Sequence, residues 1–210
     1  MDKIKRKKFN ISILGETQVG KTSMISVLKG QGFQDLMLST IGIDSTIDKA
    51  EFDGQEYMFK IFDTAGQERY ESIVSSTTIN VSDGFLMVFS VDNAETFSKI
   101  NQWLDFIDEN IDIKEKPIIL VGNKVDIDKR EVTNEDGTNL AKQKGMKYFE
   151  TSAKTGFGIK EAFHQLYNDI YEIYAKNNNS NENNDTKRKE NIVIKKDDQK
   201  VVKEKKKKFC

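Results

Sequence analysis

One stretch decides the fold class of this chain: Gly15-Glu16-Thr17-Gln18-Val19-Gly20-Lys21-Thr22. It lies between an apolar, strand-like segment, Phe9 to Leu14, and a helix-forming run, a setting typical of a P-loop. The glycines bracket a bend whose backbone N–H groups can point at a phosphate, and the helix that opens at Gly20 adds its positive dipole end. Lys21 reaches the terminal phosphates and the Thr22 hydroxyl binds Mg²⁺. The stretch therefore predicts a phosphate site between a strand and a helix.

The rest of the chain alternates between strand-like and helix-like segments, which indicates an α/β sheet. Asp53-Gly54, with strand residues on both sides, predicts a tight hairpin and therefore one antiparallel pair. The expected fold is a six-stranded, mostly parallel sheet with one antiparallel strand and helices on both faces. The predicted strands are residues 9–14, 42–52, 55–62, 84–91, 117–122 and 147–151. The predicted helices are residues 20–28, 94–110, 134–144 and 160–175.

Apolar side chains recur at helical spacing in the last predicted helix and predict a stripe that faces the core. We expect Trp103 to belong to a similar stripe on its own helix. His164, the only histidine, lies away from every loop that carries a motif, which favours a structural or surface role over catalysis. The stripe comprises Ile159, Ala162, Phe163, Leu166, Ile170, Ile173 and Tyr174.

Composition and charge divide the 210 residues into three parts. Residues 1–8 form a basic N-terminal extension, residues 9–176 form one globular domain, and residues 177–210 form an Asn-rich and Lys-rich tail that we expect to be flexible. The tail holds 11 basic and 6 acidic residues, a net charge of +5, whereas the whole chain has a net charge of −1. This balance gives no reason to expect a nucleic acid partner.

The single cysteine, Cys210, can form no internal disulfide, which fits a reducing compartment. The apolar runs are far shorter than the roughly 20 residues that a membrane span needs. The basic N-terminus lacks the apolar segment of a signal peptide. We therefore expect a cytoplasmic protein.

A second motif, Asn123-Lys124-Val125-Asp126, favours one kind of nucleotide. It directly follows a buried strand, at the carboxyl edge of the sheet where α/β proteins bind ligands. The Asp126 carboxylate can accept both the N1–H and the exocyclic amine of guanine, a donor pair that adenine lacks. The backbone N–H of Ala153, in Thr151-Ser152-Ala153-Lys154, can meet the guanine O6. Both features argue against an ATP-dependent kinase or ATPase.

With these motifs, residues 7–176 resemble the Ras superfamily of small GTPases, and the Rab branch most closely. The resemblance rests on five motifs in the order that the family shows. They are the P-loop, Ser39-Thr40-Ile41-Gly42-Ile43-Asp44, Asp63-Thr64-Ala65-Gly66-Gln67-Glu68-Arg69-Tyr70, Asn123-Lys124-Val125-Asp126 and Ser152-Ala153-Lys154.

The resemblance implies a P-loop G domain that binds GTP and GDP with Mg²⁺ and hydrolyses GTP slowly without an activating protein. Lys21 and Gln67 are the implied catalytic residues, since Lys21 neutralises charge on the phosphate oxygens and Gln67 orients the attacking water. Thr22 and Thr40 are the implied Mg²⁺ ligands, and Asp63 holds the ion through water. The implied nucleotide contacts are Gly15, Thr17, Gln18, Val19, Gly20, Lys21, Thr22, Ser23, Phe33, Thr40, Gly66, Asn123, Lys124, Asp126, Ser152, Ala153 and Lys154.

The resemblance also implies a switch. Gly66 donates its N–H to the γ-phosphate, and Thr40 binds the Mg²⁺ ion. Loss of that phosphate therefore releases the two loops that carry Thr40 and Gly66. An exchange factor, an activating protein and effectors are expected to contact residues 36–46 and 64–80. The protein is expected to be a monomer. The leading functional hypothesis is a switch in vesicle traffic, and the alternatives are a slowly hydrolysing recruitment module and a Ras-like signalling GTPase.

Several positions depart from the family pattern. Thr17 stands where Ras proteins have glycine and Rabs usually serine, and Gln18 replaces a small residue beside it. A β-branched side chain near the γ-phosphate predicts slow intrinsic hydrolysis. Residues 75–84 lack the aromatic pair of Rabs, and Phe62 and Ser45 replace a tryptophan and a phenylalanine, so the identity of the partners does not carry over.

The C-terminus departs as well, because Cys210 alone is the last residue, where Rabs usually end in two cysteines or a C-a-a-X box. This arrangement excludes C-a-a-X processing. We expect lipidation of Cys210 by prenylation of the Rab type, with Lys205 to Lys208 adding about 1 kcal/mol per lysine on an anionic leaflet. The competing interpretation is a solvated tail with an incidental thiol. Lipidation would place the protein on the cytosolic face of an endomembrane or the plasma membrane.

Overall fold

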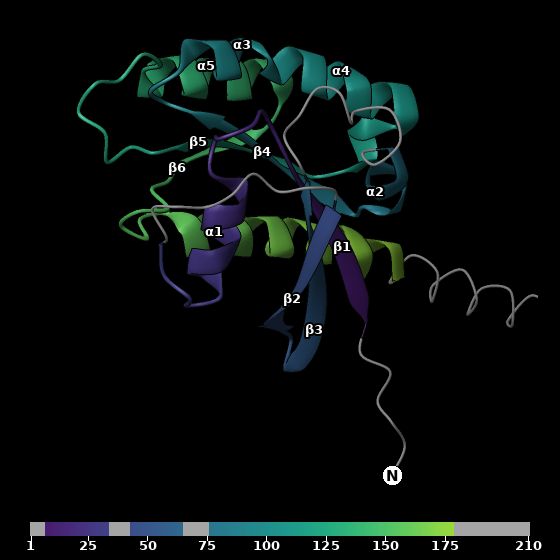
Figure 1. Ribbon diagram of the computed structural model, residues 1–210. Coiled ribbons are helices and arrows are strands. Elements are labelled where there is room, and N and C mark those ends of the chain that lie inside the picture. Colours follow the sequence, from purple (N-terminus) through teal and green to yellow (C-terminus); the bar gives the residue numbers. More distant parts are fainter. Residues whose placement is uncertain (1–6, 34–42, 65–75, 179–210) are drawn as a thin grey trace, which may run out of the picture. The chain divides into compact units, whose positions relative to one another are not determined.

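A computed structural model describes residues 7–33, 43–64 and 76–178 of the chain. The chain divides into two units, Met1–Ile170 and Tyr171–Cys210, and the sheet lies in the first. Its six described strands run in the order β2-β3-β1-β4-β5-β6 (Figure 1). They are β1 (Lys8–Leu14), β2 (Ile43–Phe52), β3 (Gln55–Thr64), β4 (Gly84–Ser90), β5 (Ile118–Asn123) and β6 (Lys147–Glu150).

The predicted sheet is confirmed in its strand number and directions. Among the described strands only β2 and β3 pair antiparallel, and every other neighbouring pair is parallel. Asp53 (φ 49°) and Gly54 (φ 71°) both adopt the left-handed conformation, as the two-residue turn of a tight hairpin requires. Because β1, β4 and β5 are central parallel strands, their carboxyl ends bring three loops to one edge of the sheet.

The helices follow the predictions with two differences. The helix predicted over residues 94–110 is interrupted at Lys99, next to Ser98, whose hydroxyl bonds the Glu95 carbonyl (2.7 Å) and competes with the helical pattern. Helix α2 was not predicted, because its sequence, STTINV, carries no helical apolar stripe. The helices are α1 (Lys21–Leu28), α2 (Ser76–Val81), α3 (Ala94–Ser98), α4 (Ile100–Asn110), the short η3 (Ile113–Glu115), α5 (Asn134–Lys144) and a final helix over residues 159–178.

Helices α3, α4 and α5 cover one face of the sheet, and α1 with residues 159–170 covers the other (Figure 1). Trp103 is buried in the first layer, as predicted. In the second layer Tyr167 stacks on Phe59, with ring centroids 4.0 Å apart, and its hydroxyl donates to Asp48 (2.9 Å). The core on the α4 side is built from Leu14, Ile79, Phe85, Met87, Phe89, Val91, Ile100, Trp103, Leu104, Ile107, Leu120, Val132 and Ala141.

The predicted stripe of the last helix is confirmed at five of its positions in the first unit, where every member is buried. Tyr167, which the spacing did not include, is fully buried, because its hydroxyl has a partner in Asp48. The prediction was wrong for Ile173, which lies in the second unit and is 37% exposed. His164 is exposed, as expected. The confirmed positions are Ile159, Ala162, Phe163, Leu166 and Ile170.

Within residues 7–33, 43–64 and 76–178, no helix combines the length and the apolar character that crossing a membrane requires.

A comparison of two glycines separates the energetic cost of backbone strain from that of steric clash. Gly158 and Gly145 share a φ of +68°, but a Cβ on Gly158 would lie 2.2 Å from the Glu150 carbonyl oxygen, whereas a Cβ on Gly145 would meet nothing within 4 Å. We predict that Gly145→Ala lowers the free energy of unfolding by about 1 kcal/mol and Gly158→Ala by about 3 kcal/mol. Chemical denaturation monitored by circular dichroism measures both, and equal losses would contradict the packing described at Gly158.

Candidate functional site

The turn between β1 and α1 wraps around the ammonium group of Lys21. This side chain is only 5% exposed, and its Nζ donates to the carbonyl oxygens of Gly15 (2.7 Å) and Glu16 (2.8 Å). A Cβ on Gly15 (φ +137°) would lie 2.0 Å from the Val88 carbonyl oxygen, and one on Gly20 (φ +98°) would lie 2.4 Å from the side-chain Nδ2 of Asn123. Only glycine fits at both ends of the turn, as the P-loop pattern requires.

The electrostatics of the turn favour an anion. Burial lowers the pKa of Lys21 to about 8, and the nearby carboxylates of Asp63 and Glu16 oppose this shift. An anion beside the ammonium would stabilise its charged form further. Helix α1 begins at Lys21, so the positive end of its dipole also lies at this turn.

A carboxylate from β3 meets the hydroxyl at the start of α1. Thr22 donates its Oγ1–H to Oδ2 of Asp63 (2.6 Å), and burial raises the pKa of the Asp63 carboxyl. The other oxygen, Oδ1, is buried and has no hydrogen-bond partner among the described residues. An orphaned carboxylate oxygen beside a hydroxyl is a hard-oxygen pair of the kind that Mg²⁺ prefers. The residues present therefore fit Mg²⁺.

The side chain of Asn123, at the end of β5, joins three loops. It is fully buried, and its Nδ2 donates to the Val19 carbonyl oxygen of the P-loop (2.8 Å). Its Oδ1 accepts from the Thr151 hydroxyl (3.0 Å) and from the Ala153 backbone N–H (3.2 Å). The phosphate loop and the two loops that follow β5 and β6 are thus held together by one amide.

Asp126 lies at the same edge and is exposed. Its Oδ1 accepts a hydrogen bond from the Ser152 hydroxyl (2.5 Å), whose oxygen in turn accepts from the Thr155 N–H (3.1 Å). These bonds fix the orientation of the carboxylate without burying it. The Ala153 N–H is bonded to Asn123, so its predicted contact with guanine O6 stays a prediction.

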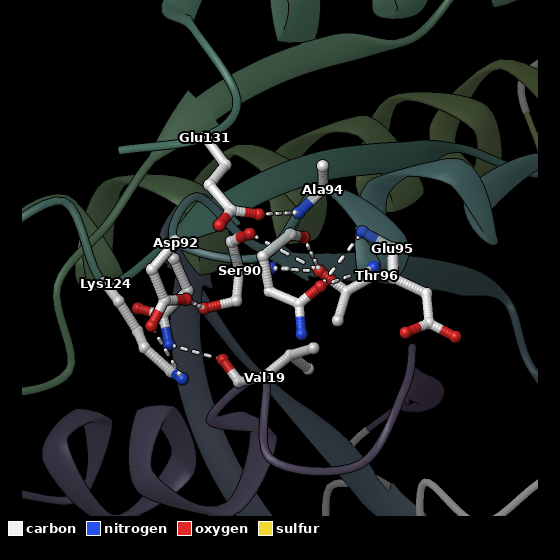
Figure 2. A network of polar contacts seen from close by, with 10 residues as sticks. Val19, Ser90, Asp92, Ala94, Glu95, Thr96, Lys124 and Glu131 are labelled. Atoms are coloured by element: carbon white, nitrogen blue, oxygen red, sulfur yellow. Dashed lines mark hydrogen bonds and ion pairs between the residues drawn. The ribbon is translucent and has the colours of Figure 1, made fainter. Parts of the chain in front are cut away.

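A polar network holds Lys124 beside the P-loop (Figure 2). Lys124 has φ 67°, a left-handed conformation uncommon outside glycine, and its ammonium lies 3.6 Å from Oδ2 of Asp92. The Ser90 hydroxyl donates to the same carboxylate, and Asn93 caps helix α3. The loop after β4 therefore presents a fixed carboxylate to Lys124, which the sequence did not reveal, because the two residues are 32 positions apart.

Some of the other predicted site residues lie within the described part of the chain, and the rest lie outside it. Thr17 and Gln18 are exposed, and Gln18 has φ 62°, a strained conformation for a residue other than glycine. Phe33 is 39% exposed, and Ser23 and Lys154 lie on α1 and in the loop after β6. Outside the described residues lie Thr40, Gly66, Gln67 and Cys210.

One bond to the P-loop comes from a residue that no sequence motif marks. The indole Nε1 of Trp103 donates to Oε1 of Glu16 (3.1 Å), 87 positions earlier in the chain. The apolar stripe on α4 could have indicated such a bond, because it predicts that Trp103 is buried and a buried indole N–H needs an acceptor.

Comparison with known proteins agrees with this geometry. Residues 10–172 match the Ras family. The chain is 37% identical to Ras-related protein Rab-8A of Bos taurus over 163 residues, which cover 77% of this chain and 78% of the relative. It is also 37% identical to Ras-related protein Rab-10 of Diplobatis ommata over 167 residues, 78% of this chain and 82% of the relative. The chain therefore belongs to the Ras family of small GTPases and is Rab-like.

Proposed function

We propose that this protein is a molecular switch in intracellular vesicle traffic, which binds GTP and GDP with Mg²⁺ and hydrolyses GTP. The observation that carries the proposal is the position of Asn123, whose buried amide ties a phosphate loop to two loops suited to a guanine base. A shared buried side chain sets the distance between the two parts of the site.

In this proposal the base lies between the loops after β5 and β6. Asp126, oriented by Ser152, accepts the two donors on the Watson–Crick edge of guanine. The stem of Lys124 lies along one face of the base, and Phe33 stacks on it. Phe33 is 39% exposed, so its ring is accessible for this contact.

The phosphates lie in the turn between β1 and α1. The Lys21 ammonium neutralises part of their negative charge, and the backbone N–H groups of the turn donate to their oxygens. Thr22 and Thr40 would bind Mg²⁺, with Asp63 reaching it through water. When bound, Mg²⁺ supplies positive charge at the phosphate oxygens. Gln67 orients the water that attacks the γ-phosphate, and Gly66 senses that phosphate by its N–H.

We further propose that residues 36–46 and 64–80 bind the exchange factor, the activating protein and the effectors. The basic tail and a lipid on Cys210 would attach the protein to the cytosolic face of a membrane.

The base assignment has a direct test. In Asp126→Asn, Oδ1 can keep the bond from Ser152, but an NH₂ group replaces the second acceptor and repels the guanine donors. We predict that GDP affinity falls about 100-fold or more, and that xanthosine diphosphate, which presents an acceptor there, binds the variant better than GDP does. Isothermal titration calorimetry measures both affinities. Asp128→Asn, an exposed acid in the same loop, is the matched control and should bind GDP like the wild type.

Thr17 keeps a second function open: a recruitment module that binds GTP but barely hydrolyses it. Its β-branched side chain is exposed on the phosphate loop, where it would crowd Gln67 or an arginine from an activating protein. We predict that Thr17→Ser speeds single-turnover hydrolysis about fivefold, which corresponds to about 1 kcal/mol of steric relief. GDP dissociation should stay unchanged as a control. Equal hydrolysis rates in variant and wild type would sink the steric explanation.

A further inference from the structure

The single tryptophan of the chain links helix α4 to the phosphate loop. Trp103 is 3% exposed and packs in the same core cluster as Leu104 and Ile107 of its own helix. Its Nε1 donates to Oε1 of Glu16, the second residue of the P-loop (3.1 Å). The ring has only two side-chain torsions and is enclosed by the core, so the position of the N–H donor is fixed.

Glu16 presents a problem for a loop that binds phosphates. Its carboxylate is close enough to Lys21 to act on that ammonium, and its own carbonyl oxygen accepts a bond from Lys21 (2.8 Å). A carboxylate that moved freely here would compete with phosphate for Lys21 and would repel the phosphate oxygens. The bond from Trp103 restrains it on the α4 side of the loop.

We propose that Trp103 is a positioning residue for the phosphate loop: its indole N–H holds the Glu16 carboxylate on the α4 side and leaves Lys21 to the phosphates. The role goes beyond core packing, because it depends on the N–H group and on the charge of Glu16. This inference rests on the proposed nucleotide-binding function.

The test uses the full chain and the dissociation rate of a fluorescent GDP analogue in the presence of Mg²⁺. Trp103→Phe keeps an aromatic ring in the core but removes the donor. We expect the analogue to dissociate about tenfold faster, the size expected for loss of a charge-assisted hydrogen bond. Adding Glu16→Gln to this variant removes the freed charge, and the rate should return close to that of the wild type.

The matched control adds Glu109→Gln to Trp103→Phe instead. Glu109 is an exposed acid on the same helix, so its removal changes the net charge equally but should give no rescue. A Trp103→Phe rate equal to that of the wild type overturns the inference, and so does a fast rate that Glu16→Gln fails to rescue, since packing would then be the cause. If the wild type does not bind the GDP analogue, the proposed function falls as well.

A second measurement does not depend on Trp103→Phe folding. The wild type has one indole N–H and therefore one indole cross-peak in a ¹H–¹⁵N spectrum. We expect Glu16→Ala to move this peak upfield, because the N–H loses a charged acceptor, and Glu109→Gln to leave it in place. An unmoved peak in Glu16→Ala would overturn the inference.

Discussion

The side-chain amide of Asn123 donates to the Val19 carbonyl oxygen and accepts from Thr151 and Ala153, all in a fully buried setting. Each bond runs from the end of β5, where the next loop begins, to the P-loop or to the loop after β6, so none of the three loops can move relative to the others without leaving a buried polar atom unpaired. Such an atom costs about 1–3 kcal/mol, which makes the arrangement of the loops close to all-or-none. The candidate site depends on this constraint, because phosphate and base must be bound at a fixed separation.

In the loops around Asn123 the backbone is held in unfavourable conformations. Gln18 and Lys124 both have positive φ, and the turn at Gly15 lies so close to β4 that a Cβ would clash with the Val88 carbonyl oxygen. Strain of this kind persists only where the surrounding structure enforces it, and it gathers at functional sites. The ion pair of Lys124 with Asp92 and the bond of Glu16 to Trp103 show how the neighbouring elements hold these loops.

The sequence predicted the sheet well, because local signals specify it. Asp53-Gly54 marks the one hairpin, and continuous apolar runs mark the buried parallel strands. Helix α2 was missed because its polar sequence is stabilised by the burial of Ile79, a tertiary effect. Tyr167 was missed because a distant carboxylate, Asp48, satisfies its hydroxyl.

In the candidate site, too, local sequence signals were predictive and contacts between distant residues were not. Glycines and Lys21 in the P-loop, and Asp126 after β5, follow from motifs whose chemistry is local. The side chains that contact the neighbouring Lys124 and Glu16, which are Asp92 and Trp103, come from other parts of the chain and carry no motif. Spacing along the chain cannot reveal a hydrogen bond between residues 87 positions apart.

The central claim is that three loops joined by Asn123 form one site for a guanine nucleotide. Calorimetric titration of the nucleotide-free chain with GDP and with ADP, both with Mg²⁺, tests it most directly. A site built to accept the guanine donors should bind GDP about 10³-fold or more tightly than ADP. Equal affinities, or no binding of either nucleotide, would contradict it.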